Sequence, residues 1–194
     1  MSKSDPASTK KEPFKTIRWV VTIFLVTIVI SGIISFASNE IMSVSSMAVA
    51  FSILLVIVLI GIFFDIIGVA VTSADESPFH SMAARKVPGA QEVIRLLRNA
   101  ERVSSICNDV IGDICGVVSG SASAAIAAQV LDKFEFSWPQ MVGLLMSALV
   151  AGLTVGGKAI GKTFAINSCT SILTGVGKAL YLFHRIPIFP HKKK

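Results

Sequence analysis

The sequence predicts an all-α membrane protein with four transmembrane helices and several amphipathic juxtamembrane helices. The chain has 194 residues, of which 53% are hydrophobic, and its mean hydropathy of +0.72 is high for a soluble domain. Long runs without a charged residue alternate with short polar segments. The net charge is +6, and the basic residues lie at the chain ends and between the apolar runs. That distribution is typical of segments held at a cytoplasmic membrane face, so we do not expect nucleic-acid binding.

The N-terminal third contains two of the predicted transmembrane helices. Residues 1–15 are polar and basic and should form a disordered tail. Residues 16–37 are long and apolar enough for a first transmembrane helix, followed by a polar loop at 38–46. The sequence "SFA" at the end of this helix resembles a signal-peptidase site, but the apolar core before it is long, which favours an uncleaved helix. Residues 47–73 form the second transmembrane helix.

The middle of the chain is amphipathic and then becomes apolar. Ser77 and Pro78 suit the start of a helix, and "VPG" at 87–89 should interrupt it, which predicts surface helices over residues 78–103. The third transmembrane helix is expected at 106–131 and is rich in small residues. Because small residues let helices approach closely inside a membrane, this helix should be central.

A fourth transmembrane helix is expected at 139–157. Residues 163–183 are long enough to span but polar, so we interpret them as a second surface helix at the interface, with a fifth transmembrane helix as the alternative. A basic tail at 185–194 ends the chain. The positive-inside rule favours four spans with both termini in the cytoplasm, because a fifth span would place "HKKK" outside. We expect the protein in the plasma membrane.

Three carboxylates fall within the predicted transmembrane helices: Asp65, Asp109 and Asp113. An acid within a membrane costs roughly 2.5–3.5 kcal/mol on insertion scales and is a candidate functional residue. Asp65 lies ~12 Å from the cytoplasmic end of its helix, and Asp113 lies ~10 Å into its own, so the depths agree. Asp109 and Asp113 are four residues apart and share a helical face. We therefore expect these acids to converge on one polar pocket.

Three like charges in a low dielectric need compensation. A divalent cation would supply it, as would protonation or the nearby Lys158 and Lys162. The plainer alternative is a salt-bridge cluster that only fixes helix packing. A zinc site is not expected, because the cysteines and histidines lack metal-ligand spacing, and an enzyme is not expected, because no nucleophile and base pair is visible.

Four motifs occur in a characteristic order. They are "FFDIIG" at 63–68, a basic segment at 83–105, "CNDVIGDI" at 107–114 and "GKAIGKTFA" at 157–165. This order resembles the transmembrane domain of the CNNM/CorC family of magnesium transporters, over about residues 48–184. The motifs are degenerate, the helix at 16–37 is additional, and the family's CBS regulatory domains have no counterpart in these residues.

The resemblance implies a magnesium site. It places Asp65, Asn108, Asp109 and Asp113 at positions where family members bind a dehydrated magnesium ion with side chains and backbone groups. Lys158 stands where the family has a glutamate, and Lys162 is retained, so both are possible counter-ions. The resemblance also implies a homodimer.

The leading hypothesis from the sequence is therefore divalent-cation transport, with Mg²⁺ as the transported ion. The expected partners are the lipid bilayer, a second copy of the chain and the cation itself. One alternative is a non-transporting regulatory or scaffold membrane protein of the same fold. Another is a monovalent-cation or proton-coupled carrier.

Overall fold

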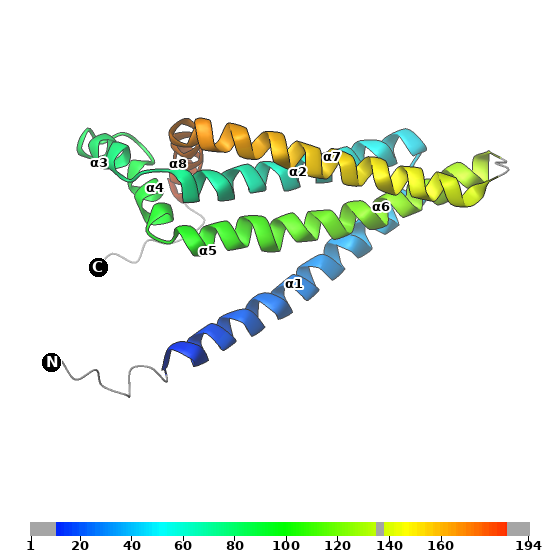
Figure 1. Cartoon of the computed structure of the whole chain (residues 1–194), viewed down its shortest axis with the longest axis horizontal. Helices are drawn as coiled ribbons and strands as arrows, with labels where there is room; N and C mark the ends of the chain where they lie inside the picture. Colours follow the sequence, from blue (N-terminus) through cyan, green and yellow to red (C-terminus); the bar gives the residue numbers. More distant parts are fainter. Residues whose placement is uncertain (1–10, 135–137, 186–194) are drawn as a thin grey trace.

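The computed structural model describes residues 11–134 and 138–185, and the regular elements in these residues are all helical (Figure 1). Four helical segments are long and apolar enough to cross a membrane, and they give a multi-pass, all-α membrane protein as predicted. The segments are Ile17–Ser38, Met47–Ser73, Ala100–Lys133 and Pro139–Asn167. Residues 1–10 and 186–194 of the predicted tails lie outside the described residues.

The first helix is longer than predicted. Helix α1 runs Lys11–Val44, so residues 11–15 are helical rather than part of a tail, and most of the predicted loop at 38–46 is helical too. Pro13 falls in the first turn, where its missing N–H costs nothing, and no glycine or proline interrupts residues 33–44. Only two residues then connect α1 to α2, which runs Met47–Ser73 with the predicted bounds.

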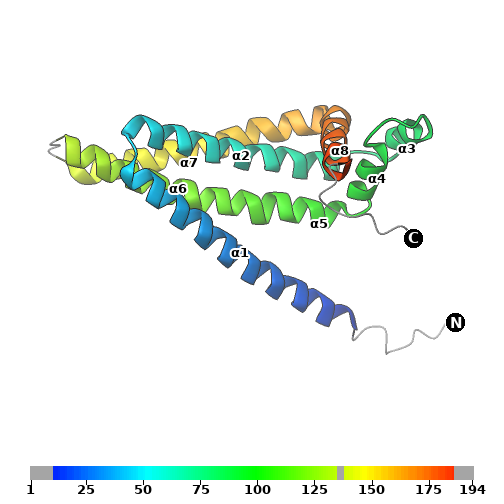
Figure 2. The same cartoon turned by 180° about the vertical axis from the view of Figure 1, so that it is seen from behind.

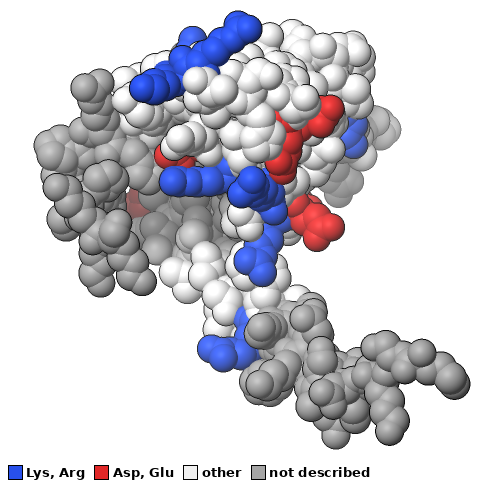
Figure 3. Space-filling model, turned by 90° about the vertical axis from the view of Figure 1, so that its left-hand side faces the viewer, with Lys and Arg blue, Asp and Glu red and all other residues white. Residues whose placement is uncertain are grey.

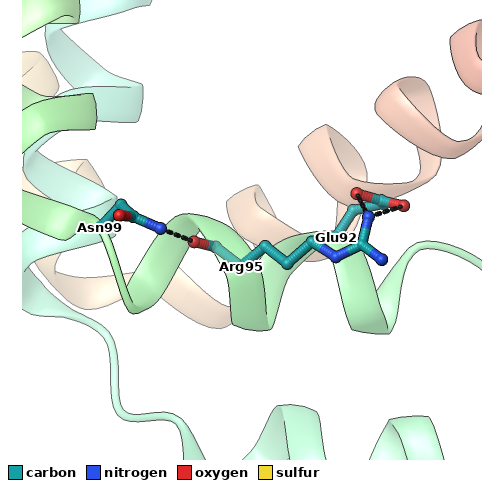
Figure 4. Close-up of polar contacts among 3 residues, drawn as sticks. All are labelled: Glu92, Arg95 and Asn99. Carbon is teal, nitrogen blue, oxygen red and sulfur yellow. Dashed lines mark hydrogen bonds and ion pairs between the residues drawn. The ribbon is translucent and has the colours of Figure 1, made fainter.

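Three short helices follow α2 at one end of the bundle: α3 (Ser77–Ala84), α4 (Ala90–Leu97) and α5 (Ala100–Ser105). The predicted break at 87–89 is present, and Gly89 there has a positive φ of 88°. Helix α4 is amphipathic, as expected, with Val93 and Leu97 buried. On its exposed side Arg95 pairs with Glu92 at 3.2 Å, and the Asn99 side chain donates to the Arg95 carbonyl at the end of the helix (Figure 4).

The third span is the central helix of the bundle, as its small residues predicted. It is a continuous helix made of α5, the π-helix η1 (Ile106–Ile111) and α6 (Gly112–Lys133). It packs against α1, α2 and α7 and is the most buried of the four spans. Its buried Ser119 and Ser123 hydroxyls each donate to a carbonyl three residues earlier, so these polar groups are satisfied within the helix.

The fourth span also exceeds its predicted length. Helix α7 runs Pro139–Asn167, so residues 163–167 belong to it rather than to the second surface helix. Glycines within it do not end the helix, because Gly157 and Gly161 pack directly against Ile62 and Ile66 of α2. Helix α8 runs Cys169–Arg185, and its 17 residues reach ~26 Å, which is less than the ~30 Å hydrocarbon core.

The helices place the polar segments together. Helices α1, α2, α6 and α7 run in alternating directions along the bundle (Figures 1 and 2). Helix α8 lies crosswise at one end of the bundle. The start of α1, the end of α7 and α3–α5 lie at this same end, where lysine and arginine side chains gather among a few acids (Figure 3). Helix α1 leans away from the others and packs mainly on α6, with most of its apolar side chains exposed. Such exposed apolar surface suits contact with lipid.

Candidate intramembrane ion site

An ion pair joins two of the spanning helices. The Nζ atom of Lys158 on α7 lies 3.7 Å from Oδ1 of Asp65 on α2. The two side chains are 28% and 13% exposed, respectively, so most of both lies inside the helical bundle. The sequence predicts Asp65 in a polar pocket with Lys158 as a possible counter-ion, and the structure brings these two residues together.

An unsatisfied amide oxygen lies close to this pair along the helices. Asn108 of η1 donates from Nδ2 to the Ser104 hydroxyl at 3.2 Å, but its buried Oδ1 atom has no hydrogen-bond partner among the residues that the structure describes. This oxygen rests on Gly68 of α2, since a Cβ atom built there would lie 2.1 Å from it. A buried acceptor without a donor costs about 1–3 kcal/mol. The contact between η1 and α2 therefore holds a polar acceptor whose hydrogen-bonding capacity is not used.

The Asp65–Lys158 ion pair and the Asn108 amide oxygen lie on neighbouring turns of the packed helices. Asp65 and Gly68 are three residues apart and lie on one face of α2. Because the Asn108 amide packs on Gly68, it lies about one helical turn, ~5 Å of rise, from the Asp65 carboxylate. On the facing helix, a Cβ atom at Gly112 would lie 3.3 Å from Nζ of Lys158. We call the set Asp65, Gly68, Asn108, Gly112 and Lys158 the polar junction. It lies where α2, η1–α6 and α7 meet.

A π-helical turn presents Asn108 to the junction. In η1 the backbone N–H of Gly112 donates to the carbonyl of Cys107, five residues earlier, instead of four. Such wide turns are rare in helices and are frequently found at functional sites. Cys107 and Val110 of this turn are buried. The turn therefore directs its inner face, including the Asn108 amide, toward α2.

The other predicted site residues lie elsewhere. Asp109 and Asp113 do share a face, but both side chains are exposed, whereas the residues directly after them, Val110 and Ile114, belong to a buried cluster. Lys162, one turn beyond Lys158, is also exposed. Within residues 11–134 and 138–185, no three His, Cys, Asp or Glu side chains gather as a group that could hold a metal ion. The expected convergence of three carboxylates does not occur.

Glycines are the site residues that sequence reasoning missed. Gly68 and Gly112 leave the space into which Asn108 and Lys158 fit, and Gly157 and Gly161 bring α7 close to α2 beside them. One signal in the sequence was available. The glycines of α7 are four residues apart and flank Lys158, which is the spacing that allows close helix approach in membranes.

Fold and junction together define an integral, multi-pass membrane protein of helical type with an Asp–Lys pair inside its bundle. A scan against protein-family models found no match to this chain, and searches of curated proteins and of solved structures found none either. The resemblance to the CNNM/CorC family is thus a prediction from the order of its motifs.

Proposed function

We propose that this protein transports a divalent cation, with magnesium as the first candidate, through the polar junction. The observation that carries the proposal is that a carboxylate, Asp65, and the unsatisfied amide oxygen of Asn108 lie about one helical turn apart, within helices that are long and apolar enough to span a membrane. Ionisable residues inside a membrane usually mark substrate or ion pathways. The motif order shared with the CNNM/CorC family supports the same reading.

The chemistry of the junction suits magnesium even with a single carboxylate. Hard cations take oxygen ligands, and Mg²⁺ commonly keeps several waters while binding one or two carboxylates. Asp65 would supply the charge and Asn108 a neutral oxygen. Asp109 and Asp113 are not needed as ligands in this arrangement, which differs in that respect from the site expected from the sequence.

Magnesium flux into liposomes tests the proposal. The purified 194-residue chain is reconstituted with a magnesium-sensitive dye inside the vesicles. Asp65→Asn is compared with a matched control, Asp132→Asn, which changes an exposed acid near the other end of α6. We expect flux in the parent and the control, and flux at the protein-free background in Asp65→Asn. Circular dichroism and gel filtration establish that each variant is folded. A parent without magnesium-dependent flux would refute the proposal.

A monovalent-cation or proton-coupled carrier is the second candidate, and the charge balance of the junction favours it. Asp65 and Lys158 form a neutral pair, so a monovalent cation that replaced the ammonium would keep the site neutral, whereas Mg²⁺ would add one positive charge. The same vesicles with a sodium or proton gradient distinguish the two ions. Flux of neither kind would favour the scaffold alternative, in which the pair only fixes helix packing.

The orientation that we propose places α3–α5 on the cytoplasmic side of the plasma membrane, with both termini there. The exposed arginines of these helices support it, because lysine and arginine are enriched in cytoplasmic segments. Reactivity of single engineered cysteines toward a membrane-impermeant reagent in intact cells tests the orientation. A cysteine in α3 should be protected, and labelling of it would contradict the proposal.

We also propose that the chain forms a homodimer through α6. Its exposed face carries small residues at four-residue intervals, a pattern that favours helix–helix contact in lipid. These residues are Gly116, Gly120, Ala124 and Ala128. Gly120→Leu should shift the detergent-solubilised protein from dimer to monomer in light scattering, while Gly32→Leu, on α1 in open space, should leave it dimeric.

A further inference from the structure

This inference deepens the proposed function and rests on it. We infer that the ammonium of Lys158 is a tethered cation, which occupies the position that an ion would take beside Asp65 and must leave Asp65 when an ion binds. The ammonium group already lies 3.7 Å from the carboxylate oxygen. An entering cation and Lys158 would therefore compete for one carboxylate.

The contact between the two groups is of a kind that permits exchange. A charge-assisted hydrogen bond between nitrogen and oxygen usually measures ~2.7–2.9 Å, so the 3.7 Å separation is an attraction of charges without a direct hydrogen bond. Lys158 is also the more exposed partner, at 28% against 13% for Asp65. The carboxylate is thus the fixed group of the pair, and the lysine is the group that is able to move.

Backbone packing explains why the ammonium is held at this point. Gly157 and Gly161 bring α7 against α2, and Gly112 has no side chain at the position where a Cβ would crowd Nζ at 3.3 Å. The Lys158 side chain therefore lies between α2 and α6 rather than extending to the end of the bundle. Lys162, one turn later on the same helix, is exposed and serves as its natural control.

Competition makes a quantitative prediction about affinity. If binding must first displace Lys158, the neutral variant Lys158→Gln should bind Mg²⁺ at least ~10-fold more tightly than the parent, which corresponds to ~1.4 kcal/mol. Lys162→Gln, which removes the same charge from an exposed position, should change the Kd less than ~3-fold, because exposed charges are screened. Adding Asp65→Asn to Lys158→Gln should abolish the gain.

The experiment measures magnesium binding to the purified 194-residue chain in lipid nanodiscs, by titration calorimetry and by the thermal stabilisation that Mg²⁺ produces. Tighter binding by Lys158→Gln, or binding detectable only in that variant, supports the inference. An unchanged or weaker affinity in Lys158→Gln, with binding by the parent intact, overturns the inference and leaves the proposed function standing. Binding by neither protein overturns the inference as well, and the flux assay on the parent then decides the proposed function separately.

Discussion

Breaking one side of the Asp65–Lys158 pair should destabilise the bundle more than removing both charges together. Asp65→Asn leaves an ammonium without its carboxylate, and Lys158→Gln leaves a carboxylate without its ammonium, in each case between mostly apolar helices. The double variant leaves two neutral amides of similar size, which can bond to each other. Leaving one charge unpaired is the costly change, because the desolvation of that charge is no longer compensated.

The structure sets the size of this effect. Coulomb's law with an effective dielectric constant of about 20 gives an attraction of about 4.5 kcal/mol for unit charges 3.7 Å apart. Lys158 is 28% exposed and makes no direct hydrogen bond to Asp65, so we reduce the coupling energy to about 3 kcal/mol. A coupling energy of about 3 kcal/mol is obtained if each single variant loses about 2 kcal/mol of unfolding free energy and the double variant loses about 1 kcal/mol.

Reversible unfolding in mixed micelles, followed by circular dichroism, measures the four free energies of the cycle. Lys162→Gln, an exposed change on the same helix, is the control and should alter the unfolding free energy by less than ~0.5 kcal/mol. Additive single changes, with a coupling energy below about 0.5 kcal/mol, would show that the two charges do not interact in the folded protein. That result would refute the Asp65–Lys158 ion pair as a contact that stabilises the packing of α2 against α7.

Two further predictions concern glycines. Gly68→Ala should lower stability by about 1–2 kcal/mol, because the new Cβ would lie 2.1 Å from Oδ1 of Asn108, and a thermal melt in detergent should show that adding Asn108→Ala restores it. Gly177→Ala should lower the free energy of unfolding by about 1–3 kcal/mol and make α8 more sensitive to protease. The reason is that its Cβ atom would lie 2.7 Å from the carbonyl oxygen of Gly89, the residue before α4. Gly175→Ala, in open space on α8, is the control for the second, and equal proteolysis of α8 in both variants would contradict it.

Apolar runs located the spanning helices, but their ends depended on packing. Helix α2 has the predicted bounds because polar residues flank its apolar run on both sides. The end of α7 was missed because a run of glycines and lysines after residue 155 resembles a helix terminus. In the folded chain Gly157 and Gly161 pack against Ile62 and Ile66 of α2, and the helix continues to Asn167.

The candidate site was predictable in part for a related reason. Depth along the helices matched Asp65 to Asp113, but Asp113 is exposed and the structure pairs Asp65 with Lys158, which the sequence suggested only as a possible counter-ion. Helical spacing showed that Asp109 and Asp113 share a face, but not which way that face points. Helix α6 carries small residues nearly all round, so its sequence does not define a buried side, and the π-helical turn before it has no sequence signature.

Close glycine contacts explain how a charged pair is tolerated inside the bundle. Lipid gives helices no hydrophobic reason to associate, so backbone approach and polar contacts must supply the stabilisation. Gly61, Gly68, Gly157 and Gly161 all lie at contacts between α2 and its neighbours, around the level of Asp65. A Cβ atom built at Gly32 of α1 would meet no atom of another helix within 4 Å in the described part of the chain, and α1 leans away from the bundle. The polar junction and the glycines around it therefore make one packed unit of α2, α6 and α7, and a change in the charge of Asp65 or Lys158 acts directly on the contact that joins α2 to α7.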